Sequence, residues 1–182
     1  EGESRVAEPQ HPALLVGLGA FGREVAQAAF PDPAGRGRNL IFLEDGEPAK
    51  VVEAAKEALR GLLDLSHFVE MTESTDARGP RCDVLVVGDL GDEETCARAP
   101  LIAAALGAEL RRELPGIFLS GEGALCVVPL LAVPRSADAA KVGAALAALE
   151  KASTAGAAER LGGRVYLAED QSGKYLLSRA EM

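Results

Sequence analysis

The feature that most constrains the fold is 14-LLVGLGAFGREVAQAAF-30, where an apolar run meets three glycines and then a helical pattern. Gly17, Gly19 and Gly22 have the order G-x-G-x-x-G directly after a predicted strand over 13–16. The following residues predict a helix with Val25, Ala26 and Ala29 on one face. In such a unit the first glycine permits a tight turn, the second lets a ligand approach the backbone, and the third lets helix and strand pack closely.

A phosphate bound by this turn would lie at the start of the helix, against the backbone of Gly19, Ala20, Phe21 and Gly22. Unpaired N–H groups and the helix dipole favour negative charge there. A turn that only packs a helix onto a strand, and binds nothing, has the same sequence pattern. Both interpretations stay open from the residues alone.

Predicted strands and helices alternate along the rest of the chain, without an internal repeat. This alternation is typical of an α/β fold with a mostly parallel sheet and helices on both faces, a Rossmann-like three-layer architecture. We expect a polar tail over 1–11 and one domain over 12–182. Further strands are expected at 40–43, 83–90, 117–119, 125–133 and 165–167, with a turn at 171–173 before a last strand over 175–177.

The expected helices are placed by their start signals. One begins near Pro48, and a second has Pro100 near its start, because proline suits the first helical turn. The second helix is expected to face inward with Leu101, Ile102, Ala105 and Leu106. A third helix is expected over 137–151, with Ser136 as its N-cap.

Composition excludes several classes of function. The net charge is −9, which argues against a nucleic-acid or acidic-membrane partner. No apolar run has the roughly 18 residues of a spanning helix and no signal peptide opens the sequence, so we expect a cytoplasmic protein without membrane insertion. The cysteines Cys82, Cys96 and Cys126 have no C-x-x-C spacing and are interpreted as buried small residues, so no metal ligands are predicted.

Two acidic residues follow the second predicted strand. Glu44 and Asp45 lie at about the 20-residue distance at which a dinucleotide-binding unit takes the ribose hydroxyls. Together with 16-VGLGAFGREVA-26 they resemble the TrkA-N (regulator of potassium conductance) domains and, more loosely, 2-hydroxyacid dehydrogenases. The first resemblance implies NAD or ATP as a regulatory ligand, and the second implies a fragment of an NAD-dependent oxidoreductase. A dehydrogenase is the weaker of these, because His11 and His67 lack a carboxylate partner at useful spacing.

The segment 83-DVLVVGDLGDEETCARAPLIAAALGAEL-110 resembles the strand, phosphate loop and helix of the tubulin and FtsZ superfamily. There an aspartate-led strand runs into G-G-G-T-G-[ST]-G and a helix that opens with Ala-Pro; Gly91, Thr95, Ala99 and Pro100 match that order, one residue short. The turn at 17–22 corresponds to the first phosphate-facing loop of the superfamily. The chain is similar in particular to the divergent bacterial tubulin-like proteins, over about 12–182.

This resemblance implies GTP as the ligand and self-association or other protein subunits as partners. An active protein would be a GTPase that needs a further domain or subunit, so no catalytic residue is assigned here. The capping-box pattern of Ser178 and Glu181 would begin another helix, and we expect the chain to be the N-terminal part of a longer protein.

The sequence departs from the superfamily at 92-DEE-94, where glycines would wrap the phosphates. At an effective dielectric of about 20 and ~5 Å, each carboxylate facing a phosphate charge costs on the order of 3 kcal/mol. The GTP site is therefore expected to be degenerate, with no ligand if it has lapsed. Alternatively, Asp92, Glu93 and Glu94 form the acidic first turn of a helix, where they favour its dipole.

Overall fold

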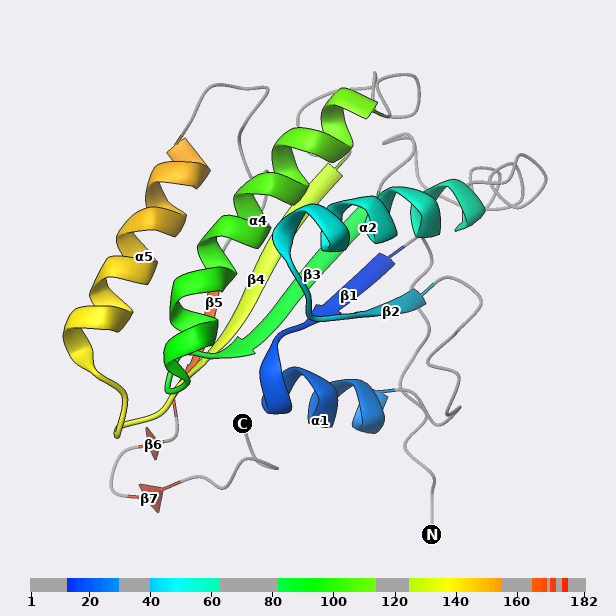
Figure 1. Ribbon diagram of the computed structural model, residues 1–182. Helices are drawn as coiled ribbons and strands as arrows, with labels where there is room; N and C mark the ends of the chain where they lie inside the picture. The colour runs from blue at the N-terminus through cyan, green and yellow to red at the C-terminus, as the bar shows by residue number, and fades with distance from the viewer. Residues whose placement is uncertain are drawn as a thin grey trace, which may run out of the picture.

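The computed structural model describes residues 13–29, 40–62, 82–113, 125–154, 165–169, 171–172 and 175–176. Its main feature is a five-stranded sheet in which all pairings are parallel (Figure 1). The strands are β1 (Ala13–Gly17), β2 (Leu40–Glu44), β3 (Cys82–Asp89), β4 (Leu125–Val133) and β5 (Tyr166–Glu169). The helices are α1 (Gly19–Ala29), α2 (Pro48–Leu62), α4 (Glu93–Glu113) and α5 (Ala139–Thr154). The expected α/β class is confirmed.

The strand order is β2-β1-β3-β4-β5. The chain moves from β1 to its neighbour β2 and then returns to β3 on the opposite side of β1. In an open α/β sheet, a reversal of this kind leaves a crevice outside the carboxyl ends of the strands, where ligands bind. The glycine turn after β1 and the loop after β3 both lie at this reversal.

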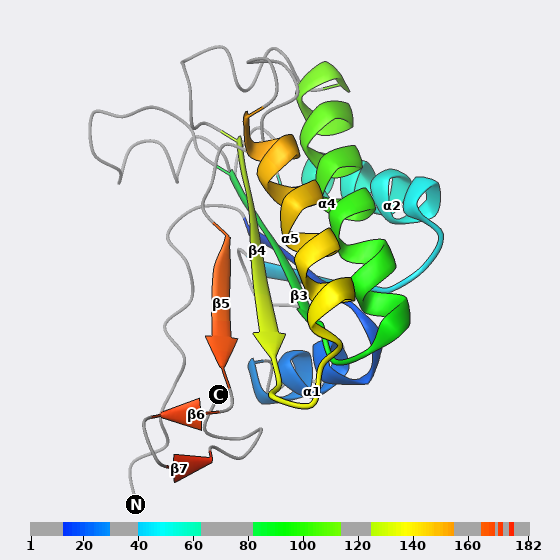
Figure 2. The same cartoon turned by 90° about the vertical axis from the view of Figure 1, so that its left-hand side faces the viewer.

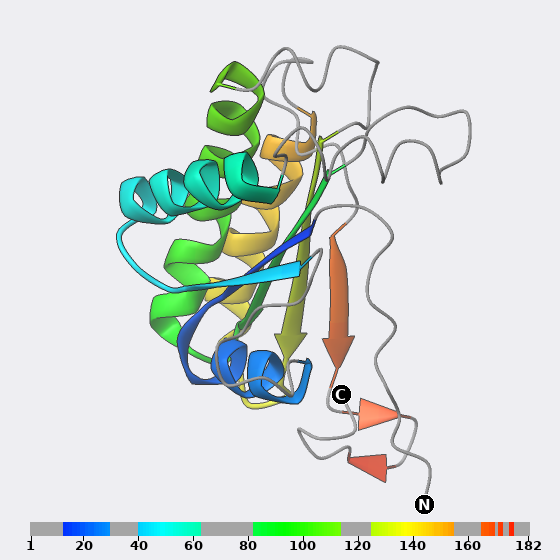
Figure 3. The same cartoon turned by 90° about the vertical axis from the view of Figure 1, so that its right-hand side faces the viewer.

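The sheet separates two hydrophobic cores, because successive side chains of a strand point to opposite faces. Leu14 and Val16 of β1 are buried in the larger core with residues of α2, α4 and α5. Leu15 instead packs with Ala26 of α1 and Val87 of β3 in a smaller core. Figure 3 shows α2, α4 and α5 on one side of the sheet, and Figure 1 shows α1 on the opposite side of β1 from α2.

Helix α4 differs from the expectation in where it begins and in one inward residue. It starts at Glu93, so Pro100 lies inside the helix and not near its start. Its start signal is Asp92, whose side chain accepts hydrogen bonds from the N–H of Thr95 at 2.9 Å and its hydroxyl at 2.7 Å. Ile102 and Leu106 are fully buried as expected, but Leu101 is 61% exposed. The expectation for Leu101 was therefore wrong, because the helix turns that side chain outward.

Helix α5 begins later than expected, at Ala139, and ends at Thr154. Asp138 is its N-cap, because its Oδ1 accepts hydrogen bonds from the N–H groups of Ala140 at 2.9 Å and Lys141 at 3.3 Å. Ser136 instead lies in the preceding turn. Aspartate and serine are comparably good caps, so composition alone did not separate them.

The expected turn at 171–173 was wrong in part, because residues 171–172 form a strand, and β5 extends to Glu169, two residues beyond its expected end. β5 pairs with β4 at the edge of the sheet (Figure 2), and β6 (Gln171–Ser172) pairs antiparallel with β7 (Tyr175–Leu176). Among the helices that the structure describes, none is long and apolar enough to cross a membrane. The expected tail over 1–11, the strand over 117–119, His11, His67 and the capping box at 178–181 lie outside the described residues.

Candidate functional site

The site is built around the turn that joins β1 to α1. Gly19, the first residue of α1, has a φ of +62°, a left-handed conformation that side-chain-bearing residues rarely adopt. This conformation is the physical reason for the second glycine of the motif. It places the start of α1 at the carboxyl end of the sheet, beside the reversal in strand order.

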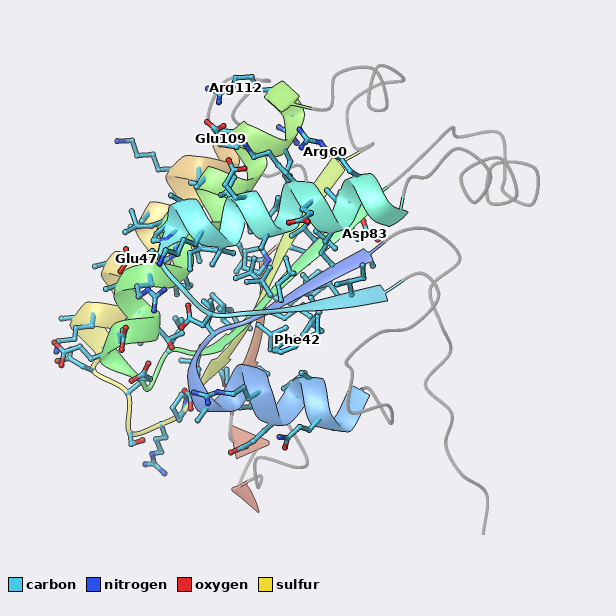
Figure 4. The ribbon with its side chains drawn as sticks, turned by 45° about the vertical axis from the view of Figure 1, so that its right-hand side comes forward. Phe42, Glu47, Arg60, Asp83, Glu109 and Arg112 are labelled. Atoms are coloured by element: carbon cyan, nitrogen blue, oxygen red, sulfur yellow. The ribbon has the colours of Figure 1, made fainter. Side chains whose placement is uncertain are left out.

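The first and third glycines are needed because α1 crosses β1 closely. A Cβ on Gly22 would lie 2.4 Å from the carbonyl carbon of Gly17, and a Cβ on Gly17 would lie 2.8 Å from the carbonyl oxygen of Gly22. The same Cβ on Gly17 would also meet the ring of Phe42 at 2.7 Å. Figure 4 shows Phe42 between β2 and α1, where it packs in the smaller core with Phe21. Packing therefore accounts for Gly17 and Gly22 without a ligand.

The loop from β3 to α4 lies opposite Gly19. A Cβ on Gly19 would lie 3.3 Å from Oγ1 of Thr95 and 3.8 Å from Oδ2 of Asp92. Thr95 is buried, and its hydroxyl donates to the same Oδ2 of Asp92. The structure thus brings together two loops that are far apart in the sequence, with a carboxylate and a hydroxyl facing the glycine turn.

The acidic run 92–94 forms the start of α4, as one of the two interpretations predicted. The hydrogen bonds from the hydroxyl and N–H of Thr95 lower the pKa of Asp92 below its ordinary value. Glu93 makes an ion pair with Lys141 of α5 at 2.7 Å, and Glu94 makes one with Arg98 at 3.1 Å. Each of the three carboxylates therefore has a structural partner.

Arg98 of α4 reaches the end of β2, a contact that the sequence did not suggest. Its Nη1 donates to Oδ2 of Asp45 at 3.0 Å, and its Nη2 lies 2.7 Å from Oδ1. Nη2 also donates to the carbonyl oxygen of Gly46. The hydrogen bond to Asp45 is the main reason that the pKa of Arg98 is raised above its ordinary value. Asp45 also accepts a hydrogen bond from the N–H of Gly19 at 3.4 Å.

The other predicted site residues are placed as follows. Ala20 is exposed, whereas Phe21 is partly buried against the smaller core. Glu44 ends β2, and its side chain is outside the described part of the structure. Gly91 donates its N–H to Asp89 at 2.7 Å, and a Cβ there would lie 2.5 Å from Pro134. Gly91 therefore has a packing role between the loops after β3 and β4.

The predicted residues that come together are thus Gly19, Asp45 and Thr95, joined by Asp92 and Arg98. Arg98 was missed because its partner Asp45 is 53 positions away; only its spacing of four from Glu94 gave a local signal. Among the described residues, no group of three or more His, Cys, Asp or Glu could hold a metal ion. Cys96 is buried as expected and donates to the carbonyl oxygen of Leu90 at 3.0 Å.

The arrangement combines the backbone N–H groups of a helix start, one guanidinium, one hydroxyl and several carboxylates. The N–H groups, the guanidinium and the hydroxyl can donate hydrogen bonds to an anionic ligand, whereas the carboxylates repel it. Comparison of the chain with protein-family models, curated proteins and solved structures found no match.

Proposed function

We propose that this chain is a divergent nucleotide-binding-type domain of the tubulin and FtsZ kind, with a weakened GTP site between β1 and α1. Its proposed role is assembly or scaffolding in the cytoplasm, by self-association or with other protein subunits. This proposal rests on the resemblance of 83–110 to the superfamily's phosphate-loop segment and on the geometry of the glycine turn.

The observation that carries the proposal is the position of Gly19. It has a left-handed φ of +62° at the first residue of α1, and the loop from β3 to α4 lies opposite. A phosphate at this turn would meet the N-terminal N–H groups of α1 and the positive end of its dipole. In the order β2-β1-β3-β4-β5, this turn is also at the reversal where sheets of this class bind ligands.

The acidic side chains explain why the proposed site is weak. Asp45 and Asp92 both lie at the turn, and each would repel a phosphate by on the order of 3 kcal/mol at ~5 Å and an effective dielectric of about 20. Arg98 offsets part of this repulsion, because it is paired with Asp45 at 2.7 Å. A divalent cation carried by the nucleotide would offset more of it.

Calorimetric titration with GTP tests this proposal. We expect measurable binding with Mg²⁺ and weak or no binding with a chelator, since Arg98 offsets only part of the repulsion and the cation offsets more of it. Gly19→Ala tests whether GTP binds at the glycine turn, and we expect this variant to bind GTP more weakly. Its Cβ would lie 3.3 Å from Oγ1 of Thr95, and alanine would be strained in this backbone conformation. Tight GTP binding in the presence of chelator, or unchanged binding by Gly19→Ala, contradicts the proposed site.

A second candidate, a ligand-sensing domain for NAD or ATP, is favoured by Asp45. This residue directly follows β2, which is where a dinucleotide-binding unit has the acid that binds the ribose. In that case Asp45→Ala weakens NAD or ATP binding by about 1–3 kcal/mol, because a charge-assisted hydrogen bond is lost. Parallel titrations with NAD, ATP and GTP decide, since a loss confined to NAD or ATP supports this candidate and unchanged affinity for both excludes it.

A further inference from the structure

The carboxylate of Asp45 lies at the glycine turn, beside the first residue of α1. Asp45 lies 26 positions after Gly19 in the sequence, and its carboxylate accepts a hydrogen bond from the N–H of Gly19. A carboxylate at a helix N-terminus satisfies the same N–H donors and the same dipole as a bound phosphate. A nucleotide that binds through this N–H must therefore compete with Asp45.

Arg98, rather than the turn, holds the carboxylate in this place. The bond from Gly19 is 3.4 Å long, beyond the usual range of 2.7–3.2 Å, whereas Arg98 approaches the two carboxylate oxygens at 3.0 and 2.7 Å. The guanidinium is itself fixed by the carbonyl oxygen of Gly46 and by Glu94. Asp45 is thus attached to α4 and only weakly bonded to α1.

The pair is incomplete and reachable from solvent. Oδ1 of Asp45 is buried and accepts no hydrogen bond of good geometry among the described residues, although Nη2 of Arg98 is close. The side chains of Arg98 and Asp45 are 21% and 26% exposed. Because its bond to Gly19 is long, the carboxylate loses little when another anion takes its place beside that N–H.

We propose that Asp45 is a resident anion that autoinhibits the glycine turn, and that a phosphate group binds by displacing it from Gly19. This inference rests on the proposed function for the identity of the ligand. The competition lowers phosphate affinity in the unmodified protein. It also links the turn to α4, because Arg98 of α4 is the residue that holds Asp45 beside Gly19.

Titrations with inorganic pyrophosphate and with GTP test this proposal, because pyrophosphate has no ribose or base to contact Asp45. Asp45→Asn removes the charge at nearly the same shape, and Asp45→Ser removes it with a different side chain. Glu57→Gln is the matched control, since it makes the same change in net charge at an exposed position of α2. Circular dichroism of each variant checks that it is folded.

We expect both Asp45 variants to bind pyrophosphate and GTP about tenfold more tightly than the unmodified protein and Glu57→Gln, equivalent to about 1.4 kcal/mol. Equal or weaker pyrophosphate binding by folded Asp45 variants contradicts the proposal that Asp45 autoinhibits the turn. The proposed function still stands in that case if the unmodified protein binds GTP. A gain for pyrophosphate without GTP binding by any variant supports the resident anion and contradicts the GTP site. No binding of either probe by any variant overturns both.

Discussion

At the scale of single residues, the three glycines of one motif have different physical reasons. Position 19 requires glycine because its φ is +62°. Positions 17 and 22 require glycine because α1 crosses β1 so closely that a Cβ at either position would overlap backbone atoms of the other. Only the first of these reasons concerns the position where a ligand would bind. The motif is therefore evidence for a β-α unit first and for a phosphate site second.

Replacement of Gly22 by alanine is expected to destabilise the protein by about 3 kcal/mol, because the new Cβ meets backbone atoms that cannot give way. The nearest of them is the carbonyl carbon of Gly17 at 2.4 Å. Gly143 of α5 is the control, because a Cβ there meets nothing within 4 Å. Gly143→Ala should stabilise the helix by about 0.5–1 kcal/mol. Urea unfolding of both variants measures the difference, and similar stabilities would show that the crossing is looser than described.

At the scale of secondary-structure elements, the start of α4 shows how a local acidic run acquires its structural role. Asp92 caps the helix through Thr95, and Glu93 and Glu94 follow in the first turn, where carboxylates interact favourably with the helix dipole. Asp92 also faces Gly19, because a Cβ on that glycine would lie 3.8 Å from its Oδ2. One segment therefore stabilises the helix and makes the neighbouring turn more negative.

Asp92→Ala is expected to cost about 1 kcal/mol at pH 7, the usual contribution of an N-cap. Because the folded-state pKa of Asp92 is lowered from 3.8, the ionised side chain stabilises the folded protein above pH 3.8. This contribution is lost as the pH falls below 3.8 through the folded-state value. Urea unfolding of both proteins between pH 7 and pH 2 should show the stability difference shrinking at acid pH. A difference that does not depend on pH would assign the effect to packing and not to the ionised cap.

At the scale of the whole molecule, net charge and exposed apolar side chains act in opposite directions on assembly. The net charge of −9 makes copies of the chain repel each other. Leu101 of α4, with Tyr166 and Leu167 of β5, leaves large apolar side chains 61%, 54% and 48% exposed. The proposed assembly role requires the apolar contacts to prevail once the repulsion is screened.

Self-association is therefore expected to increase with ionic strength. Salt at 0.5 M shortens the Debye length to less than half of its value of about 14 Å at 0.05 M, which weakens charge repulsion but not apolar contact. Sedimentation velocity at several protein concentrations, in both salts, measures the effect. A single species at every concentration and in both salts would contradict self-association and leave other protein subunits as the proposed partners.

The amino-acid sequence by itself determined the α/β class, the parallel sheet and the β1–α1 turn. Strand β4 was predicted with its observed ends, and β1, β2 and β3 were predicted to within one residue. These features depend on apolar runs, glycine spacing and turn residues, which act over a few neighbouring positions. The start of α4 and the cap of α5 were misplaced, because several neighbouring residues offered comparable start signals.

Only the tertiary structure decided what surrounds the turn. Arg98 and Asp45, which form an ion pair, are 53 positions apart in the sequence. Their contact depends on how α4 packs against the sheet beside the end of β2. The outward direction of Leu101 likewise follows from where α4 begins and which face it buries. Pairing between distant charged groups has no local pattern, because it arises from the geometry of the packed elements and not from the propensities of the residues themselves.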